Sequence, residues 1–255
     1  MIFPILLLSP SKGMDSTSIP EASADLRPLP FPDTSKQVWR AVKELNAASF
    51  KRAMKVSPKL LPEVQSIWNR PWSHFSSPKA PLAGATAYVG EAFKWLDLQS
   101  LSPEGQGRAR DQVHVLSALY GLVQPDTAIA PYRLEMQAPL AEAPFGTLYQ
   151  LWRPVLTERL NQLEAPFLVN AMSGEYSKAV DWDRIHTPVL HVDFKQEKNG
   201  EIKSMSVFSK QARGAFVRWM VEESVGSIDH AMKFDLHNYR FYEQKDNKVV
   251  FLRHA

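Results

Sequence analysis

Apolar positions along the chain follow two spacings, and the short continuous runs predict strands. The predicted strands are residues 2–8, 167–170 and 189–194. Asn199-Gly200 is typical of a type I′ turn, from which we expect the chain to return as far as Phe208. A last hairpin is predicted over residues 238–253.

Apolar residues three or four positions apart predict the helices. From Lys36 to about Asn69 the spacing is helical, and Pro58 is expected to begin a new helix because proline is tolerated in a first turn. Two further predicted helices are residues 109–123 and 147–163. Serine and proline are frequent at residues 16–35 and 70–82, which we expect to be irregular.

These elements predict a single mixed α/β domain. A central mixed sheet would be flanked by helices, with an inserted helical hairpin region at about residues 36–69. The 255 residues contain no internal repeat and no long linker, and 44% of them are hydrophobic. That fraction is enough to bury a substantial core.

Composition narrows the chemistry. With 30 basic and 27 acidic residues the formal charge is only +3, so any binding of an anion must depend on a local patch. The absence of cysteine excludes disulfides, thiolate nucleophiles and cysteine metal sites. The seven histidines show no metal-binding spacing, so no metal site is predicted, and no cofactor is indicated.

The apolar first eight residues require a choice between a signal peptide and a buried strand. The run lacks a basic region before it, contains Pro4 and passes directly into a polar segment that holds Lys12. It is also too short to span a bilayer. We therefore expect a buried strand in a cytoplasmic protein with no membrane partner.

The segment Ala130–Met136 places two opposite charges close together. Arg133 and Glu135 are two positions apart, so they project from the same face if the segment is extended. Such a pair on a loop made rigid by Pro131 suits recognition of an anion. The alternative is a structural salt bridge between the two residues, which would tie the loop to the body of the protein.

Lys210 and Arg213 are expected near the start of a helix. At about 100° per residue their side chains fall roughly 60° apart, where the helix dipole favours an anion. The opposite side is expected to be core and contains Phe208, Ala212, Ala215, Phe216 and Trp219. The alternative interpretation of the two cations is a solvated helix face.

Residues 173–178 follow a predicted strand and appear at the expected start of a helix, a junction that commonly presents ligands. Ser173 is explained by helix capping, and Glu175 complements the helix dipole. Lys178 has the unfavourable sign there and needs a negative partner, either Glu175 or a bound anion.

Glu135 and Glu175 are also candidates for acid–base catalysis. Ser9 and Ser173 lack a nucleophile-elbow motif.

Several of these motifs, in this order, resemble the YaaA-like peroxide-stress family of bacterial proteins. The motifs are Leu8–Asp15, Leu116–Pro125, Ala130–Met136, Leu148–Trp152, Asn170–Lys178 and Phe208–Gly214. The most specific parts are the PYRLEM run and the Lys-x-x-Arg-Gly run. The resemblance extends from the first strand to about residue 224 and is weaker after that.

The resemblance implies protection against peroxide by DNA binding through a helix-hairpin-helix element. The corresponding stretch is about residues 50–61, whose basic residues are Lys51, Arg52, Lys55 and Lys59. A hairpin of this kind normally uses glycine so that backbone amides can approach phosphate, and no glycine occurs between Phe50 and Trp68. Electrostatic, non-specific contact with DNA remains the expectation, with any selectivity for shape or single strands.

A competing hypothesis is an enzyme. Lys12, Arg133, Lys178, Lys210 and Arg213 suit a phosphorylated or nucleotide-like small substrate, with a glutamate as general base or Mg²⁺ ligand. Clustering of these cations in one concave pocket would favour the enzyme, whereas a flat basic surface around Lys51, Lys55 and Lys59 would favour DNA. A protein partner is a third possibility that no motif singles out.

Overall fold

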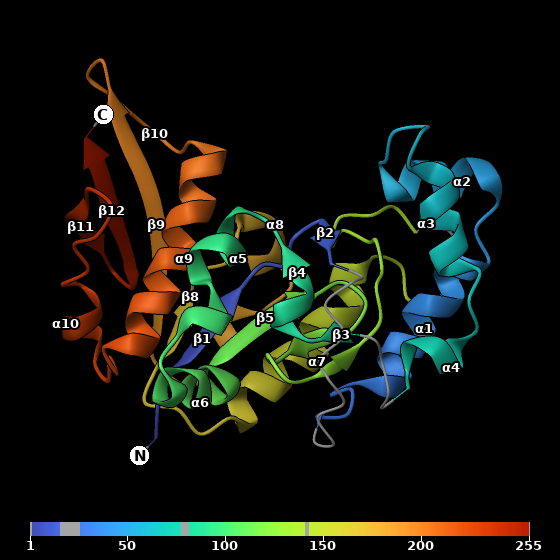
Figure 1. Cartoon of the computed structure of the whole chain (residues 1–255), viewed down its shortest axis with the longest axis horizontal. Coiled ribbons are helices and arrows are strands. Elements are labelled where there is room, and N and C mark those ends of the chain that lie inside the picture. Colours follow the sequence, from blue (N-terminus) through green and yellow to red (C-terminus); the bar gives the residue numbers. More distant parts are fainter. Residues whose placement is uncertain (1, 16–25, 78–81, 141–142, 255) are drawn as a thin grey trace.

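An eight-stranded mixed sheet runs through the protein (Figure 1). The computed structural model describes residues 2–15, 26–77, 82–140 and 143–254. The strands are β1 (Ile5–Leu8), β5 (Val113–Ser117), β6 (Gly121–Val123), β8 (Leu168–Asn170), β9 (Val189–Lys198), β10 (Glu201–Lys203), β11 (Tyr239–Lys245) and β12 (Lys248–His254). Their order is β11-β12-β9-β8-β1-β5-β6, with β10 paired to β9, so the predicted mixed α/β fold is confirmed.

Five neighbouring strands of the sheet are parallel, and their order creates a switch point. β12, β9, β8, β1 and β5 pair in parallel, whereas β6, β10 and β11 pair antiparallel with their neighbours. From β1 the chain goes first to β5 on one side and later to β8 on the other. In sheets of this kind, ligands bind beyond the carboxyl ends of the strands where the order reverses.

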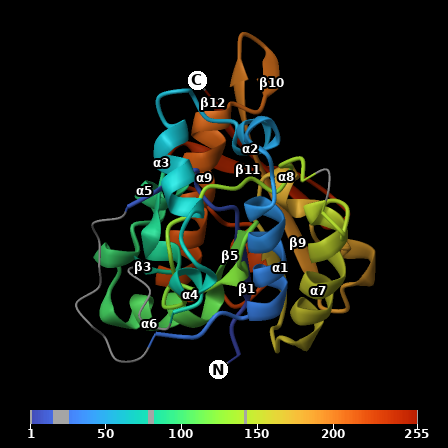
Figure 2. The same ribbon diagram turned by 90° about the vertical axis from the view of Figure 1, so that its right-hand side faces the viewer.

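Helices cover both faces of the sheet (Figures 1 and 2). The helices are α1 (Pro32–Lys43), α2 (Ala47–Met54), α3 (Leu61–Trp68), α4 (Trp72–Phe75), α5 (Glu91–Leu96), α6 (Pro103–Gln112), α7 (Leu148–Gln162), α8 (Gly174–Ser177), α9 (Ser206–Glu222) and α10 (Ile228–Ala231). α7 lies on one face, while α5, α6 and α9 lie on the other. Within the described ranges, every helix is too short or too polar to cross a bilayer.

The core under α9 is aromatic. Phe216 on α9 packs against Phe194 of β9, Phe234 and Phe251 of β12, with ring centroids 5.2–5.8 Å apart. Edge-to-face contacts of this kind add to the stabilisation from buried area. They fix the rotation of α9 about its axis and therefore the direction of its polar face.

Helices α1–α4 gather at one end of the molecule, on the right in Figure 1. The predicted helical region is confirmed, but the helix expected to begin near Pro58 is α3, which begins at Leu61. α2 ends at Lys55, which adopts a left-handed conformation with φ of 46°. Lys55 thus occupies the backbone position for which a helix-terminating glycine is usual.

The helix predicted over residues 109–123 is wrong. α6 ends at Gln112, and the chain continues into β5 and β6 with Gly121 at φ of 74°. All residues from Gln112 to Val123 are buried. Strands buried on both faces carry a near-continuous apolar run, which also satisfies a helical spacing by coincidence.

Two other loop predictions need adjustment. The Asn199-Gly200 turn is confirmed, with positive φ at both residues, but β10 ends at Lys203 and Phe208 lies in α9. The hairpin of β11 and β12 and the helix α7 are confirmed.

The two segments predicted to be irregular, residues 16–35 and 70–82, contain helical residues. α1 already begins at Pro32 in the first, and α4 lies within the second. Residues 16–25 and 78–81 of those segments lie outside the described residues.

Two β-ribbons connect the loops to the body. β2 (Gly13–Met14) pairs with β4 (Tyr88–Val89), and β3 (Leu82–Ala83) pairs with β7 (Ala128–Ile129). The first ribbon places the segment after β1 beside the segment that leads into α5. A close approach between α5 and α9 then fixes that segment, because a Cβ atom at Gly214 would lie only 1.9 Å from the carbonyl oxygen of Ala92.

We expect Gly214→Ala to destabilise the protein by roughly 2–3 kcal/mol, because the added methyl group forces α5 away from α9. The matched control is Gly107→Ala on α6, where an added Cβ meets nothing within 4 Å. That control should gain about 0.5–1 kcal/mol from the helix preference of alanine. Urea denaturation of both variants measures the two effects. Equal unfolding free energies for the two variants would contradict the close packing.

Candidate functional site

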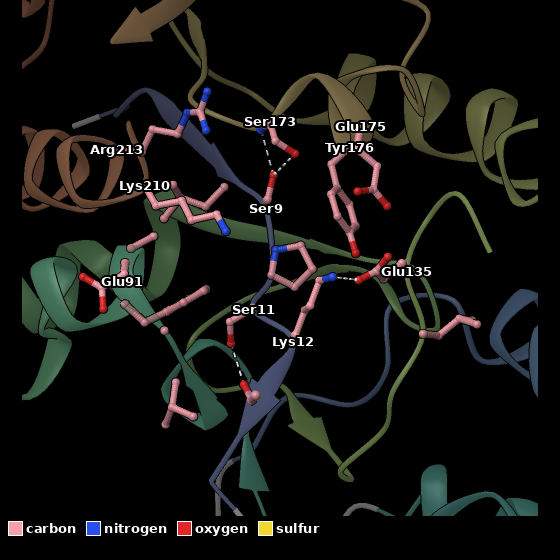
Figure 3. A pocket seen from close by; sticks show the side chains of 18 of the residues that line it. Ser9, Ser11, Lys12, Glu91, Glu135, Ser173, Glu175, Tyr176, Lys210 and Arg213 are labelled. Carbon is pink, nitrogen blue, oxygen red and sulfur yellow. Dashed lines mark hydrogen bonds and ion pairs between the residues drawn. The ribbon is translucent and has the colours of Figure 1, made fainter. Parts of the chain in front are cut away.

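A pocket of about 330 Å³ opens beyond the carboxyl ends of β1 and β8 (Figure 3). Its position is the switch point of the sheet, where a ligand site is expected on topology alone. Three motifs from distant parts of the sequence meet there with the start of α5 and of α9. The lining residues are Leu8, Ser9, Pro10, Ser11, Lys12, Gly13, Val89, Gly90, Glu91, Ala92, Phe93, Tyr132, Arg133, Leu134, Glu135, Ala171, Ser173, Glu175, Tyr176, Lys210 and Arg213.

Arg213 brings to this pocket a half-buried positive charge that forms no ion pair in the described part of the chain. Its Nε atom is buried and has no hydrogen-bond partner in the described part of the chain. Burial lowers the pKa of the guanidinium, and Asp193 and Tyr239 only partly oppose this effect. An arginine nevertheless stays charged in proteins, and burying an unpaired charge is costly. The side chain is therefore poised to accept an anion.

Lys210 lies one helical turn before Arg213 and lines the same pocket. Its side chain is exposed, and in Figure 3 it extends toward the interior of the pocket. Within the described residues it forms no hydrogen bond or ion pair. The pKa of Glu91 is lowered mainly by the hydrogen bond from Gln211, and the charge of Lys210 makes a smaller contribution in the same direction. Lys210 and Arg213 together make one end of the pocket cationic.

Lys12 and Glu135 form an ion pair at the other end of the pocket. The Lys12 side chain is 63% exposed, whereas that of Glu135 is only 8% exposed. Burial raises the pKa of Glu135, but the hydrogen bond and charge of Lys12 and the charge of Arg133 outweigh it, so the pKa is lowered overall. Glu135 is therefore an ionised acceptor and not a proton donor at neutral pH.

Arg133 does not form the structural salt bridge with Glu135 that the sequence left open. Its Nη1 atom donates to the carbonyl oxygen of Lys12 at 2.8 Å, and its buried Nε has no partner in the described ranges. The backbone of Arg133 accepts a hydrogen bond from Trp68 Nε1 at 3.2 Å. The pocket loop is thus tied to α3 as well as to the segment after β1.

Buried hydroxyl groups hold the Ala130–Met136 segment in place under the pocket. Tyr132 Oη lies 3.0 Å from Tyr88 Oη and accepts from Ser117 Oγ at 2.8 Å. Burial raises the pKa of Tyr132 to about 12, although the hydrogen bonds with Ser117 and Tyr88 oppose the rise. The phenol therefore stays neutral, and the network fixes the loop without adding charge.

Glu175 and Tyr176 face the pocket from the start of α8, beside Glu135 (Figure 3). One carboxylate oxygen of Glu175 accepts from the backbone N–H of Gln137 at 3.2 Å. Burial, and then the charges of Tyr132, Glu175 and Glu135, raise the pKa of Tyr176 well above its ordinary value. This end of the pocket thus combines two carboxylates with a neutral phenol.

Ser9 and Ser173 join the loops after β1 and β8. Ser9 Oγ accepts from the backbone N–H of Ser173 at 2.8 Å and donates to Ser173 Oγ at 3.2 Å. Ser173 occupies the N-cap position of α8 as predicted, but its side chain makes no capping hydrogen bond. The hydroxyl groups are therefore part of the pocket wall, next to Arg213 in Figure 3.

The structure brings together most of the predicted pocket residues but not all of them. Those that line the pocket are Lys12, Arg133, Glu135, Glu175, Lys210 and Arg213. Lys178 is outside it, because α8 is a single turn that ends at Ser177 and leaves Lys178 exposed at the C-cap. There its charge has the favourable sign for the helix dipole, which removes the need for an anion.

The predicted DNA-contact residues form a separate surface. Lys51, Arg52, Lys55 and Lys59 are all exposed and lie on α2 and the connection to α3. None of them lines the pocket. Figures 1 and 2 both place this connection on the upper side of the molecule, the side on which α9 begins.

Sequence reasoning missed the wall formed by residues 89–93. Glu91 accepts from Gln211 Nε2 at 2.7 Å, and Gly90 passes so close to Ser11 that a Cβ would lie 2.9 Å from its side chain. A glycine directly before a glutamate at a helix start was the available signal. In the described residues, no group of three or more histidine, aspartate or glutamate side chains forms a candidate metal site.

Because Glu135 pairs with Lys12 and not with Arg133, substitutions of Lys12 and Arg133 should affect stability differently. We expect Lys12→Ala to lower the free energy of unfolding by about 1–2 kcal/mol, because it leaves the Glu135 carboxylate unpaired. The loss is smaller than for a fully buried pair, because Lys12 is exposed. Arg133→Ala should cost less, because it leaves no carboxylate without its cation. Thermal melts of both variants and of Lys12→Ala/Glu135→Ala measure this, and the double variant should recover stability. A larger loss for Arg133→Ala would contradict the pairing.

The same pair gives a pH dependence with a defined sign. Because the folded-state pKa of Glu135 is lowered, its contribution is present above the unfolded pKa of about 4.3 and is lost as pH falls through the folded value. The stability difference between the protein and Glu135→Gln should therefore shrink in acid.

Comparisons with known proteins show the family of this chain. Residues 5–245 match the family model described as peroxide stress protein YaaA, so the match continues past residue 224 into β11. The UPF0246 protein of Shewanella pealeana is 34% identical, covering 98% of both chains. The UPF0246 proteins of Shewanella halifaxensis (33%; 98% and 99%) and Marinomonas sp. strain MWYL1 (32%; 97% and 96%) are similar over the same extent. The chain belongs to the YaaA peroxide stress family.

Proposed function

We propose that this member of the peroxide stress family binds a phosphorylated or nucleotide-like small molecule in the pocket. The observation that carries the proposal is Arg213, a half-buried side chain at the pocket whose Nε has no hydrogen-bond partner among the described residues. Lys210 adds a second cation beside it. Phosphate is the anion that a fork of guanidinium N–H groups with a nearby ammonium suits best.

The pocket also has groups that suit chemistry on such a ligand. Glu175 is a candidate general base, because only one of its carboxylate oxygens accepts a hydrogen bond from the described chain. Glu135 is the weaker candidate, since Lys12 lowers its pKa. Mg²⁺ commonly binds one or two carboxylates together with substrate phosphates, so the pair also suits that ion. This is the enzyme hypothesis in its most specific form.

Arg213→Met should cost little stability, because the change removes a half-buried cation that forms no ion pair among the described residues. It should also weaken the binding of inorganic phosphate by about 10–100-fold, the value of a hydrogen bond to a charged group. The measurement is the rise in melting temperature with added phosphate, compared with chloride at equal ionic strength. The matched control is Lys178→Met, an exposed cation outside the pocket, which should keep the full response.

Two outcomes would count against the pocket. A large destabilisation of Arg213→Met without phosphate would make the arginine a structural residue. An unchanged response to phosphate in a stable Arg213→Met protein would remove the anion from this site.

A second candidate function is contact with DNA through the connection between α2 and α3. The observation that favours it is the group of four exposed cations, including Lys55 in a left-handed conformation. A lysine at that backbone position is less stable than glycine, so the turn carries this charge at a cost in stability. Peroxide protection by this route would rest on non-specific contact with phosphates.

If three of these lysines contact duplex phosphates, the log of affinity should fall against log salt with a slope near −3. The triple variant Lys51→Ala/Lys55→Ala/Lys59→Ala should flatten that slope for every DNA sequence.

Lys55→Gly separates the effect of charge from that of backbone geometry, because it should stabilise the turn by about 1 kcal/mol while still weakening DNA binding. Lys233→Ala, an exposed change next to α10, is the control. Undiminished binding by the triple variant would exclude this surface.

A further inference from the structure

The two ends of the pocket carry different side chains. This difference indicates which chemical group the ligand carries at the end opposite its phosphate. Figure 3 shows Arg213, Lys210, Ser9 and Ser173 on one side of the pocket. Glu135, Glu175 and Tyr176 lie on the other side. A ligand that fills the pocket therefore meets Lys210 and Arg213 at one end and, at the other, two carboxylates of which Glu135 is paired with Lys12.

The carboxylate end requires hydrogen-bond donors. An ionised carboxylate accepts only, and Glu175 receives one backbone N–H while Glu135 is already held by Lys12. The remaining acceptor capacity of Glu175 has no donor among the described residues. A ligand carbonyl oxygen placed there would face like charge, whereas an amino group would form a charge-assisted hydrogen bond.

The size and walls of the pocket limit the ligand further. A volume of about 330 Å³ is at the small end of the range for ligand sites, which suits one mononucleotide and not a dinucleotide. Leu8, Pro10, Phe93, Tyr132 and Leu134 supply apolar lining between the polar groups. Such walls accommodate the flat face of a heterocycle.

We propose that the ligand is a nucleotide whose base carries an exocyclic amino group, with its phosphate at Arg213 and Lys210 and its amino group at Glu175. This inference rests on the proposed binding of a phosphorylated ligand and adds the selection of the base. The base amino group donates to the free oxygen of Glu175. The site thus discriminates an amino base from its oxo counterpart, because the oxo form presents an acceptor to a carboxylate.

The experiment compares two matched pairs of mononucleotides by calorimetry, AMP with IMP and CMP with UMP. The protein should bind the amino member of each pair about tenfold tighter, the ratio expected for one hydrogen bond to a half-buried charged group. Glu175→Gln should narrow the ratio, because a glutamine amide can donate to an oxo group. Lys178→Gln is the surface control and should keep the ratio.

Arg213→Met should weaken all four nucleotides by a similar factor, because it acts on the phosphate that they share. Equal binding of the amino and oxo members by the unchanged protein would overturn the base selection while leaving phosphate binding in place. Failure of inorganic phosphate and all four nucleotides to bind would overturn both proposals. These two failures are therefore distinguishable.

The same nucleotide chemistry occurs free in solution and at the end of a DNA strand. Short single-stranded oligonucleotides that begin with dA, with and without a 5′-phosphate, separate the two sources. Tighter binding of the 5′-phosphorylated strand than of AMP assigns the pocket to strand ends, and tighter binding of AMP assigns it to the free nucleotide. Under either assignment, replacing the terminal dA by deoxyinosine should weaken binding by about the AMP-to-IMP ratio. Equal binding of the two termini, together with equal binding of AMP and IMP, would overturn the inference.

Discussion

The position of β1 between two parallel partners determines where everything else in the site can lie. β1 pairs with β5 on one side and β8 on the other, so the loops that follow β1 and β8 leave the same edge of the sheet together. Ser9 and Ser173 join these loops directly. Without this reversal in strand order, the residues after β1 and those before α8 would have no common cavity. The pocket is thus a consequence of topology before it is a consequence of side chains.

Charge is distributed in the pocket at some expense of stability. Lys12 and Glu135 form an ion pair, whereas Arg213 is half-buried on α9 and its Nε has no partner in the described part of the chain. The aromatic contacts of Phe216 and the close approach at Gly214 fix that helix strongly enough to keep the arginine where it is. Stability in the core of the protein therefore supports an unfavourable arrangement at its functional surface, as is common in ligand sites.

Local sequence patterns predicted the strands and helices whose periodicity is clear, and they failed where burial removed the periodicity. The run from Val113 to Val123 is buried throughout and mostly apolar, and its spacing predicted a helix, although only the pairing with β1 decides that it forms strands. Motifs predicted Lys12, Arg133, Lys210 and Arg213 correctly as neighbours. The pairing of Lys12 with Glu135 and the exclusion of Lys178 could not be predicted, because they depend on where the chain turns after β1 and on the length of α8.

The pairing of β1 also has a kinetic consequence. Leu6 is in register with Val113 on one side and Val169 on the other, so its contacts join segments that are far apart in the chain. Contacts at such separations slow folding, because the intervening loops must be ordered first. The apolar strand Ile5–Leu8 is made early and waits for both partners. The pocket at its end also needs residues from α8 and α9, so it can form only after those segments have been synthesised.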